Sequence, residues 1–409
     1  MRYRILMGFL LAILGVCSAQ LSAQTLKVDP KKVDPKTEPK VDPKVDPKAE
    51  PKFEWPKKIA DKDLAHYVKE MREAKDASTR DAAIHILPAF GPDATKAASV
   101  NLIHAMSLDT DVNVRLSAIS TVPLIFFDTK DVDAGLNALV KIITPANGGS
   151  NQMKHAAAMA LGGCGPLAKR AIPVLTDFTL KDVASWQNRK AAAFALARIG
   201  QPTGKDDGPD LKVVHALSLS LRTETSHMVR REIVNALMLL GPPRVEATWK
   251  EMRAALTYVA EKDTDRSVSI WARVALIRSE QDLITDKDPN LQVLVKLLSQ
   301  SDPALKLEAL QALASVGEEA KSRMGDILAF VNNEKEEPFI VATAIWVLSQ
   351  MKSEANKLIP IIDPMQRHKD PFIKAAAEAA YRALTEKFDP DKKDPMPKKD
   401  VPKKDTKKL

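Results

Sequence analysis

The sequence is poor in cysteine, glycine and aromatic residues, and each shortage excludes a class of protein. Two cysteines cannot support a disulfide scaffold, and 15 glycines among 409 residues exclude a collagen-like chain. No apolar run reaches 18 residues, which argues against a protein with several membrane spans. Aromatic residues make up only 5% of the chain, but 45% of it is hydrophobic. At roughly 100 to 200 residues per domain, its length allows two or three compact domains.

The positive charge is confined to the ends of the chain. The formal net charge is +8, which alone would suggest a basic surface for nucleic acid or membranes. The excess, however, lies in the first residues, in residues 20–58 and in residues 385–409, where basic residues outnumber the acids. Residues 59–384 carry equal numbers of basic and acidic residues. We therefore expect a neutral central body that binds no specific nucleic acid.

The first 19 residues have the pattern of a secretory signal peptide. A basic start, an apolar stretch over residues 5–16 and small residues at 17–19 follow one another. The apolar stretch is shorter than the ~20 residues of a spanning helix, so we expect cleavage after Ala19, or alternatively after Ala23, and no transmembrane span. This predicts an exported protein, located in the periplasm, the cell envelope or the extracellular space.

Two other outcomes for the leader stay open. It is either retained as a membrane anchor or lipidated at Cys17, although the bulky Val16 departs from the small residue that a lipidation site prefers. After cleavage Cys164 is the one cysteine left, so no intrachain disulfide can form. We expect Cys164 to be a small core residue rather than a nucleophile.

Both flanks of the body are rich in lysine and proline. Between residues 27 and 51 a Lys-x-acid-Pro unit occurs six times, and residues 389–409 have similar chemistry. Proline at every fourth position prevents a helix and favours an extended, solvated chain. We predict a spacer over residues 20–58 and a tail over residues 389–409, each disordered. Either the spacer and the tail serve as a tether that makes weak contacts with polyanions, or they have no specific partner.

The body consists of one segment type that occurs nine times at intervals of 33 to 41 residues. A reference position, basic in six of the nine copies, marks each copy: Arg80, Arg115, Lys154, Arg189, Arg230, Ser269, Lys306, Val341 and Lys374. Four residues earlier stand the expected helix N-caps: Asp76, Asp111, Ser150, Ser185, Ser226, Asp265, Asp302, Glu337 and Asp370. Pro303, Pro338 and Pro371 follow three of these caps, at the position where a helix tolerates proline.

Eight of the nine copies then have alanine three positions after the reference position, where the copy at Arg230 has Ile233, and a large side chain, apolar or Tyr381, follows seven positions after it in every copy. This stripe predicts a helix whose core side lets a neighbouring helix approach closely. Five copies have glycine at position eleven, where we expect left-handed caps: Gly91, Gly165, Gly200, Gly241 and Gly317. A second amphipathic helix follows, for example over residues 167–180, 213–221 and 291–298. Each copy is therefore predicted to be helix, turn, helix.

The recurring series consists of a cap, a basic residue four positions later, the alanine and leucine steps and an Ile-Gly end, as in residues 188–200. This series resembles HEAT repeats, including their bilin-lyase-like subclass, of a secreted bacterial type. The resemblance covers residues 59–388. It implies an all-α, right-handed alpha-alpha superhelix, that is, a HEAT/armadillo-like solenoid, of about nine helix pairs. It also implies that the recurring Asp and Arg form a hydrogen-bonded ladder between neighbouring repeats. We expect this ladder to be interrupted at Ser269 and Val341.

Motifs of catalysis are missing from the sequence. The seven histidines form no HExxH pair, and there is no CxxCH, GxSxG or phosphate-binding loop. The glycines of residues 162–165 fall where a repeat helix ends, and residues 203–210 lack the register of a calcium loop. We therefore predict no catalytic residue, no cofactor and no metal site.

The remaining candidates are side chains one or five positions after the reference position, which we place near the concave groove of the solenoid. They are His155, Met159, Phe194, Asn235, Gln311 and Trp346. The alternative is that Phe194 and Trp346 fill space between repeats in an alanine-rich core, as we expect of Trp249 and Trp271.

The sequence thus predicts a non-enzymatic exported scaffold or protein-binding module that uses this concave face for a protein partner. A bilin-lyase-like enzyme, and a tether to envelope polyanions through the lysine-rich tails, are the alternatives.

Overall fold

The computed structural model describes residues 54–125, 132–145, 149–204, 207–279, 288–333 and 335–385. The predicted signal peptide, nearly all of the predicted spacer and the C-terminal tail lie outside the described residues, as does part of the acidic loop at residues 203–210. From Trp55 onward the described residues belong to one compact unit.

The unit begins with a short antiparallel hairpin that the sequence did not indicate. Strand β1 (Lys58–Ile59) pairs with β2 (Lys62–Asp63), and the turn residues Ala60 and Asp61 both have positive φ. The hydroxyl of Tyr67 donates a hydrogen bond of 2.8 Å to the carbonyl oxygen of Ile59 and attaches the hairpin to the first helix.

Apart from this hairpin, the described residues fold into helices that pair in chain order. The pairs are α2 (Leu64–Glu73) with α3 (Ala77–Ile86), α4 (Pro92–Leu108) with α5 (Val112–Ile125), α6 (Val132–Ile143) with α7 (Asn151–Gly163), the segments on either side of α8 (Ile172–Val174) with α9 (Trp186–Ile199), α10 (Leu211–Thr223) with α11 (His227–Leu240), α12 (Glu246–Lys262) with α13 (Arg266–Ser279), α14 (Pro289–Leu297) with α15 (Pro303–Val316), α16 (Met324–Val331) with α17 (Pro338–Ser349), and α18 (Ala355–Ile362) with α19 (Pro371–Thr385). The predicted all-α solenoid of nine helix pairs is confirmed for this part of the chain.

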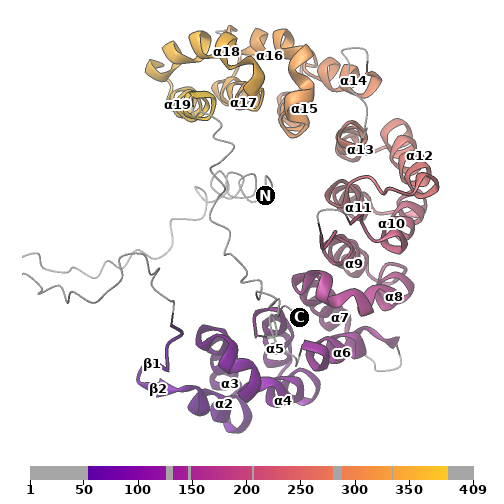
Figure 1. Ribbon diagram of the computed structural model, residues 1–409, viewed down its shortest axis with the longest axis vertical. Coiled ribbons are helices and arrows are strands. Elements are labelled where there is room, and N and C mark those ends of the chain that lie inside the picture. The colour runs from indigo at the N-terminus through magenta and orange to yellow at the C-terminus, as the bar shows by residue number, and fades with distance from the viewer. Residues whose placement is uncertain are drawn as a thin grey trace, which may run out of the picture. The chain divides into compact units, whose positions relative to one another are not determined.

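The paired helices form two rows (Figure 1). The odd-numbered helices from α3 to α19, which carry the reference positions, form what we call the first row, and each of them contacts the next along the row. The even-numbered helices form the second row, in which α2 contacts α4, α4 contacts α6 and α10 contacts α12. Each repeat therefore packs against its immediate neighbours, as in a solenoid.

The starts of the first-row helices are set by the predicted caps. In seven of the nine copies the side chain at the expected position accepts a first-turn amide: Asp76, Asp111, Ser150, Ser185, Asp265, Asp302 and Asp370. The prediction is wrong for Ser226 and Glu337, whose side chains make no such bond. Pro338 nevertheless occupies the first helical position after Glu337, where its fixed φ favours the helix.

The ends of these helices correct the sequence analysis in detail. Gly91, Gly165, Gly241 and Gly317 have positive φ as expected, but Gly200 has a φ of −80° and ends α9 through its amide. At Gly91, Gly241 and Gly317, however, ψ is −148°, −177° and −128°, so these residues lie in an extended region that favours glycine and the predicted left-handed helical cap is wrong there. The predicted second helix over residues 167–180 is divided into a 3₁₀ segment, α8 and a π-helical turn.

The predicted core stripe is confirmed with one exception. All nine residues at position three and eight of the nine at position seven are buried, while Tyr381 is half-buried. The buried side chains form two clusters, one from Tyr67 to Leu276 and the other from Ile270 to Leu384. Both clusters include side chains of α13, so this helix packs against both cores and separates them.

Candidate functional site

The first-row helices are joined by hydrogen bonds between a basic side chain of one repeat and an acid of the next. Nε and Nη2 of Arg189 donate to the Glu224 carboxylate at 2.7 and 2.8 Å, and Nη1 donates to the carbonyl oxygen of Asp182 at 2.8 Å. Arg230 donates to Asp263 at 2.6 and 2.7 Å in the same way. Each arginine thus links the turn that precedes its own helix to the following turn.

Two further rungs repeat this arrangement. Arg80 donates to both carboxylate oxygens of Asp109 at 2.8 Å, and Lys306 reaches the Glu336 carboxylate at 2.9 Å. Bidentate arginine–carboxylate pairs of this kind fix geometry as well as adding energy. The rungs therefore hold successive first-row helix starts in register.

The ladder expected from the family resemblance exists, but its acids are not the recurring cap residues. The paired acid comes two residues before the cap in three rungs and directly before it in the fourth. The same carboxylates also hold the turn, since Asp109 accepts the amide of Asp111 at 2.8 Å and Glu224 accepts that of Ser226 at 2.7 Å. One acid therefore fixes both its own turn and the arginine of the preceding repeat.

These bonds shift the ionisation of the acids. The hydrogen bond from Arg80 is the main cause that lowers the pKa of Asp109. Burial alone would raise the pKa of Glu224, but the hydrogen bonds from Arg189 and from the Ser226 amide outweigh it, so the pKa is lowered. Both carboxyl groups are therefore held in the charged form that the ladder requires.

The ladder is interrupted where the sequence predicts it. The Ser269 hydroxyl donates instead to the carbonyl oxygen of Ala260 at 2.6 Å, and Val341 has no polar group. Two more interruptions were not predicted. Arg115 donates over 3.4 Å to the carbonyl oxygen of Met106, and within the described residues Lys154 pairs with no carboxylate.

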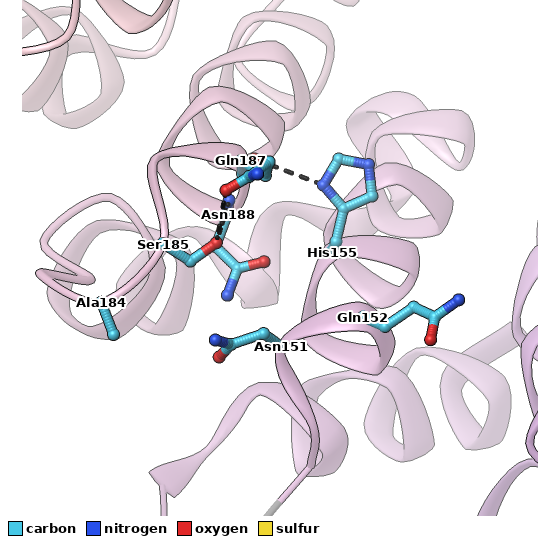
Figure 2. Close-up of a pocket in the computed structure, with 7 residues that line it drawn as sticks. All are labelled: Asn151, Gln152, His155, Ala184, Ser185, Gln187 and Asn188. Carbon is cyan, nitrogen blue, oxygen red and sulfur yellow. Dashed lines mark hydrogen bonds between the residues drawn. The ribbon is translucent and has the colours of Figure 1, made fainter.

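A polar pocket lies in the first row between the starts of α7 and α9 (Figure 2). Its volume is about 380 Å³, and its lining residues are Asn151, Gln152, His155, Ala184, Ser185, Gln187 and Asn188. Of these residues only His155 is predicted from the sequence, and its Nδ1 lies 3.3 Å from the carbonyl oxygen of Gln187. The pocket is therefore built from first-turn residues of two adjacent repeats.

Asn188 is the buried member of this pocket. Its side chain is 0% exposed, its amide nitrogen Nδ2 donates to Asp182 Oδ2 at 2.8 Å, and its backbone amide donates to Ser185 Oγ. The amide oxygen Oδ1 has no hydrogen-bond partner in the described structure. Asn188 does not stand out in the sequence, because it lies next to the reference residue, at a position outside the recurring series of cap, basic and apolar residues.

The other five candidates lie along the first row but not in one site. Met159 is on α7 and is 39% exposed. Half-buried positions on four other first-row helices are occupied by Phe194, Asn235, Gln311 and Trp346. The structure therefore places all six on one row, and their role in binding stays a prediction.

Two of the large side chains also pack within the solenoid. The Arg198 guanidinium lies 5.7 Å from the centre of the Phe194 ring, and Trp346 packs against the second core cluster. Trp271 and Trp249 are likewise half-buried against the cores, and Trp271 donates to Glu308 at 3.1 Å. Phe194 and Trp346 therefore fill space between repeats while part of each ring stays exposed.

Cys164 is 8% exposed, and burial raises the pKa of its thiol to about 11. A thiol in this state is a poor nucleophile. Among the residues the structure describes, no group of three or more His, Cys, Asp or Glu could hold a metal ion. Within the same residues no helix is long and apolar enough to cross a membrane.

No family model matches the sequence, and no curated protein matches it. Importin beta is similar in structure with a TM-score of 0.50 at 12% identity, covering 78% of this chain and 46% of that chain. The karyopherin Kap121p, solved bound to the SUMO protease Ulp1p, has a TM-score of 0.43 at 12% identity and covers 78% of this chain and 37% of that chain. An engineered protein has a TM-score of 0.28 at 18% identity, and the match covers 78% of this chain and 98% of that chain.

This chain therefore spans less than half the length of the two karyopherins. At these identities the likeness concerns the fold, which is an all-α solenoid resembling HEAT-repeat proteins.

Proposed function

We propose that the chain is a non-enzymatic exported scaffold that binds an extended protein segment along the first row. The observation that carries the proposal is the set of partly exposed apolar side chains on this row, on α7, α17 and α19. Met159, Phe339 and Phe372 are 39%, 40% and 61% exposed. Exposed methionine and aromatic side chains are typical anchors of protein interfaces.

The first row is the part of the solenoid that suits this role. Rungs tie the helix starts at four of its junctions, α3 to α5, α9 to α11, α11 to α13 and α15 to α17, so a partner would meet a partly pre-organised surface, which reduces the entropic cost of binding. The Phe339 and Phe372 rings also contact one another, with ring centres 6.5 Å apart at 90°, and form an aromatic step between α17 and α19. The leader would carry the protein out of the cytoplasm, and the two lysine-rich flanks would set its distance from other envelope components.

The proposal is tested by cross-linked capture from envelope extract with residues 20–409 and with residues 57–388. Each is run at low and at moderate salt. We expect both forms to retain the same discrete protein. The double variant Trp346→Ala and Phe194→Ala should release it while circular dichroism shows intact helices.

Tyr258→Ala is the matched control, because this exposed aromatic residue lies on α12 in the second row and is 49% exposed. It should leave capture unchanged. If only residues 20–409 retain material, and salt removes it, binding belongs to the tails and the proposal is wrong.

A further inference from the structure

Helix α13 lies where the two hydrophobic cores meet, between α11 and α15 in the first row (Figure 1). Its buried side chains are divided between the cores, and Trp271 packs against both. In the second row α10 packs directly on α12, whereas α14 packs mainly on α13 and α15. The earlier block of repeats (residues 64–262) and the later block (residues 289–385) therefore share apolar packing chiefly through α13.

The Glu308 carboxylate on α15 joins the later block to α13. Its Oε1 atom accepts a hydrogen bond from the Ser267 hydroxyl and one of 3.1 Å from Nε1 of Trp271. Both donors lie on α13, so this tie runs in the opposite direction to a ladder rung, in which a basic side chain of one repeat reaches an acid of the next. Glu308 thus provides the polar contact at the junction where Ser269 replaces the basic residue of the ladder.

This tie is more accessible to solvent than the rungs. The Glu308 side chain is 23% exposed, whereas the rung acids Asp263 and Glu224 are 2% and 5% exposed. A charged group near solvent loses less free energy when its hydrogen bonds break, because water takes the place of the lost partners. The contact between Glu308 and α13 can therefore open at a lower cost than a rung.

A second polar contact lies on the other side of α13. Nη1 of Arg273 donates to Oδ1 of Asn290 at 3.1 Å, and Nη2 donates to the carbonyl oxygen of Ala260 at 2.7 Å. Asn290 is at the start of α14 and Ala260 is near the end of α12, so Arg273 ties the later block to both helices of the repeat before it. Residues two apart on a helix point about 160° away from one another, which places Arg273 and Trp271 on opposite sides of α13.

We propose that α13 is a hinge between the two blocks, with the Arg273 contacts as its pivot and the Glu308 carboxylate as its lock. While Glu308 accepts from Ser267 and Trp271, the first row keeps one course from α11 to α15. When these bonds break, the later block turns about Arg273 and the spacing of α11 and α15 changes. The inference goes beyond the proposed function, because it concerns a change in the course of the first row. A partner that contacts both helices would bind one setting of the hinge more tightly and shift the equilibrium toward it.

The experiment measures distances between pairs of nitroxide labels by double electron–electron resonance in the full chain, with Cys17 and Cys164 replaced by alanine. One pair, Ala254→Cys on α12 and Ala329→Cys on α16, spans the hinge. The other pair, Ala254→Cys and Lys169→Cys, lies within the earlier block, and each pair is two repeats apart. All three labelled residues are exposed.

We expect Glu308→Ala to broaden the distance distribution of the pair across the hinge at least twofold and to leave the pair within the earlier block unchanged. Glu318→Ala is the matched control, because Glu318 accepts the amide of Ser353 at 3.0 Å and both residues belong to the later block. It should leave both distributions unchanged.

Trp271→Phe keeps the test decisive if Glu308→Ala unfolds, because it removes the indole N–H that donates to Glu308 and keeps an aromatic ring. It should broaden the pair across the hinge while circular dichroism shows intact helices. Unchanged distances in the folded variants would overturn the lock. Equal broadening of both pairs would show that flexibility is spread evenly along the solenoid, and the hinge would be wrong.

Discussion

Gly162 on α7 lies directly against Ala195 on α9. A methyl group added at Gly162 would be 2.9 Å from the Cα atom of Ala195 and 3.2 Å from the Phe194 ring. The Gly162 carbonyl oxygen also accepts a hydrogen bond of 3.0 Å from Arg198. The two helices therefore touch near their C-terminal ends, while the polar pocket lies between their starts.

Substitution of Gly162 should therefore destabilise the solenoid and disturb the pocket. We expect Gly162→Ala to lower the free energy of unfolding by about 1–3 kcal/mol, because overpacking forces the helices apart. Gly325→Ala is the control, since an added methyl group there meets no atom within 4 Å. Urea titration monitored by circular dichroism measures both variants. A Gly162→Ala variant as stable as the wild type would contradict the close packing.

Loss of one ladder arginine should leave a buried acid without its partner. The side chains of Arg230 and Asp263 are 14% and 2% exposed, and breaking such a pair costs about 3–5 kcal/mol. We expect Arg230→Met to lower stability by this amount in urea unfolding. Arg231→Met is the neighbouring control, because Arg231 is 49% exposed and lies 4.0 Å from Glu308. Equal effects of the two substitutions would argue against a ladder.

The ladder should also make the protein sensitive to acid. The pKa values of Asp109 and Glu224 are lowered from ordinary values of 3.8 and 4.5, so the unfolded chain takes up protons before the folded one. Their contribution to stability is complete above these ordinary values and is lost as the pH falls through the folded pKa values. We expect Glu224→Gln to be less stable at pH 7 but to have a flatter stability curve below pH ~4.5. A curve parallel to that of the wild type would exclude this role.

The thiol of Cys164 should be unreactive in the folded protein. Burial raises its pKa to about 11, so little thiolate exists at neutral pH. We expect iodoacetamide at pH 7.5 to leave Cys164 unmodified, and urea to expose it to rapid alkylation. Peptide mapping by mass spectrometry reports this residue separately from Cys17. Rapid modification of Cys164 in the native state would show that the helix end around it opens.

The helices could be predicted from the sequence because each copy fixes its own start. Asp302 is followed by Pro303 and Asp370 by Pro371, and these local signals need no knowledge of the neighbours. Gly200 was misjudged because glycine permits positive φ but does not require it. The division of residues 165–180 into three short segments depends on their packing against α6 and α9. The spacing of apolar residues along one helix gives no information about such contacts.

The ladder acids could have been found in the sequence. Asp109, Glu224 and Asp263 each stand six residues before the next reference position, which is a recurrence that the cap residues conceal. The pocket could not have been found in the same way. It depends on two adjacent helix starts and on the bond that orients Asn188, and neither follows from the spacing of one repeat.

The place of α13 has a consequence for how the chain unfolds. Its residues Val268 and Ala272 belong to one core, while Ile270 and Val274 belong to the other, and the ladder is interrupted on this helix at Ser269. The two blocks of repeats thus share α13, and polar contacts from this helix to the later block take the place of the missing rung, among them those of Trp271 with Glu308 and of Arg273 with Asn290. Damage on one side need not spread to the other, because α13 can keep its contacts with the intact block. The solenoid therefore has two hydrophobic cores that can unfold separately, and a partner bound across α11 and α15 would couple their unfolding.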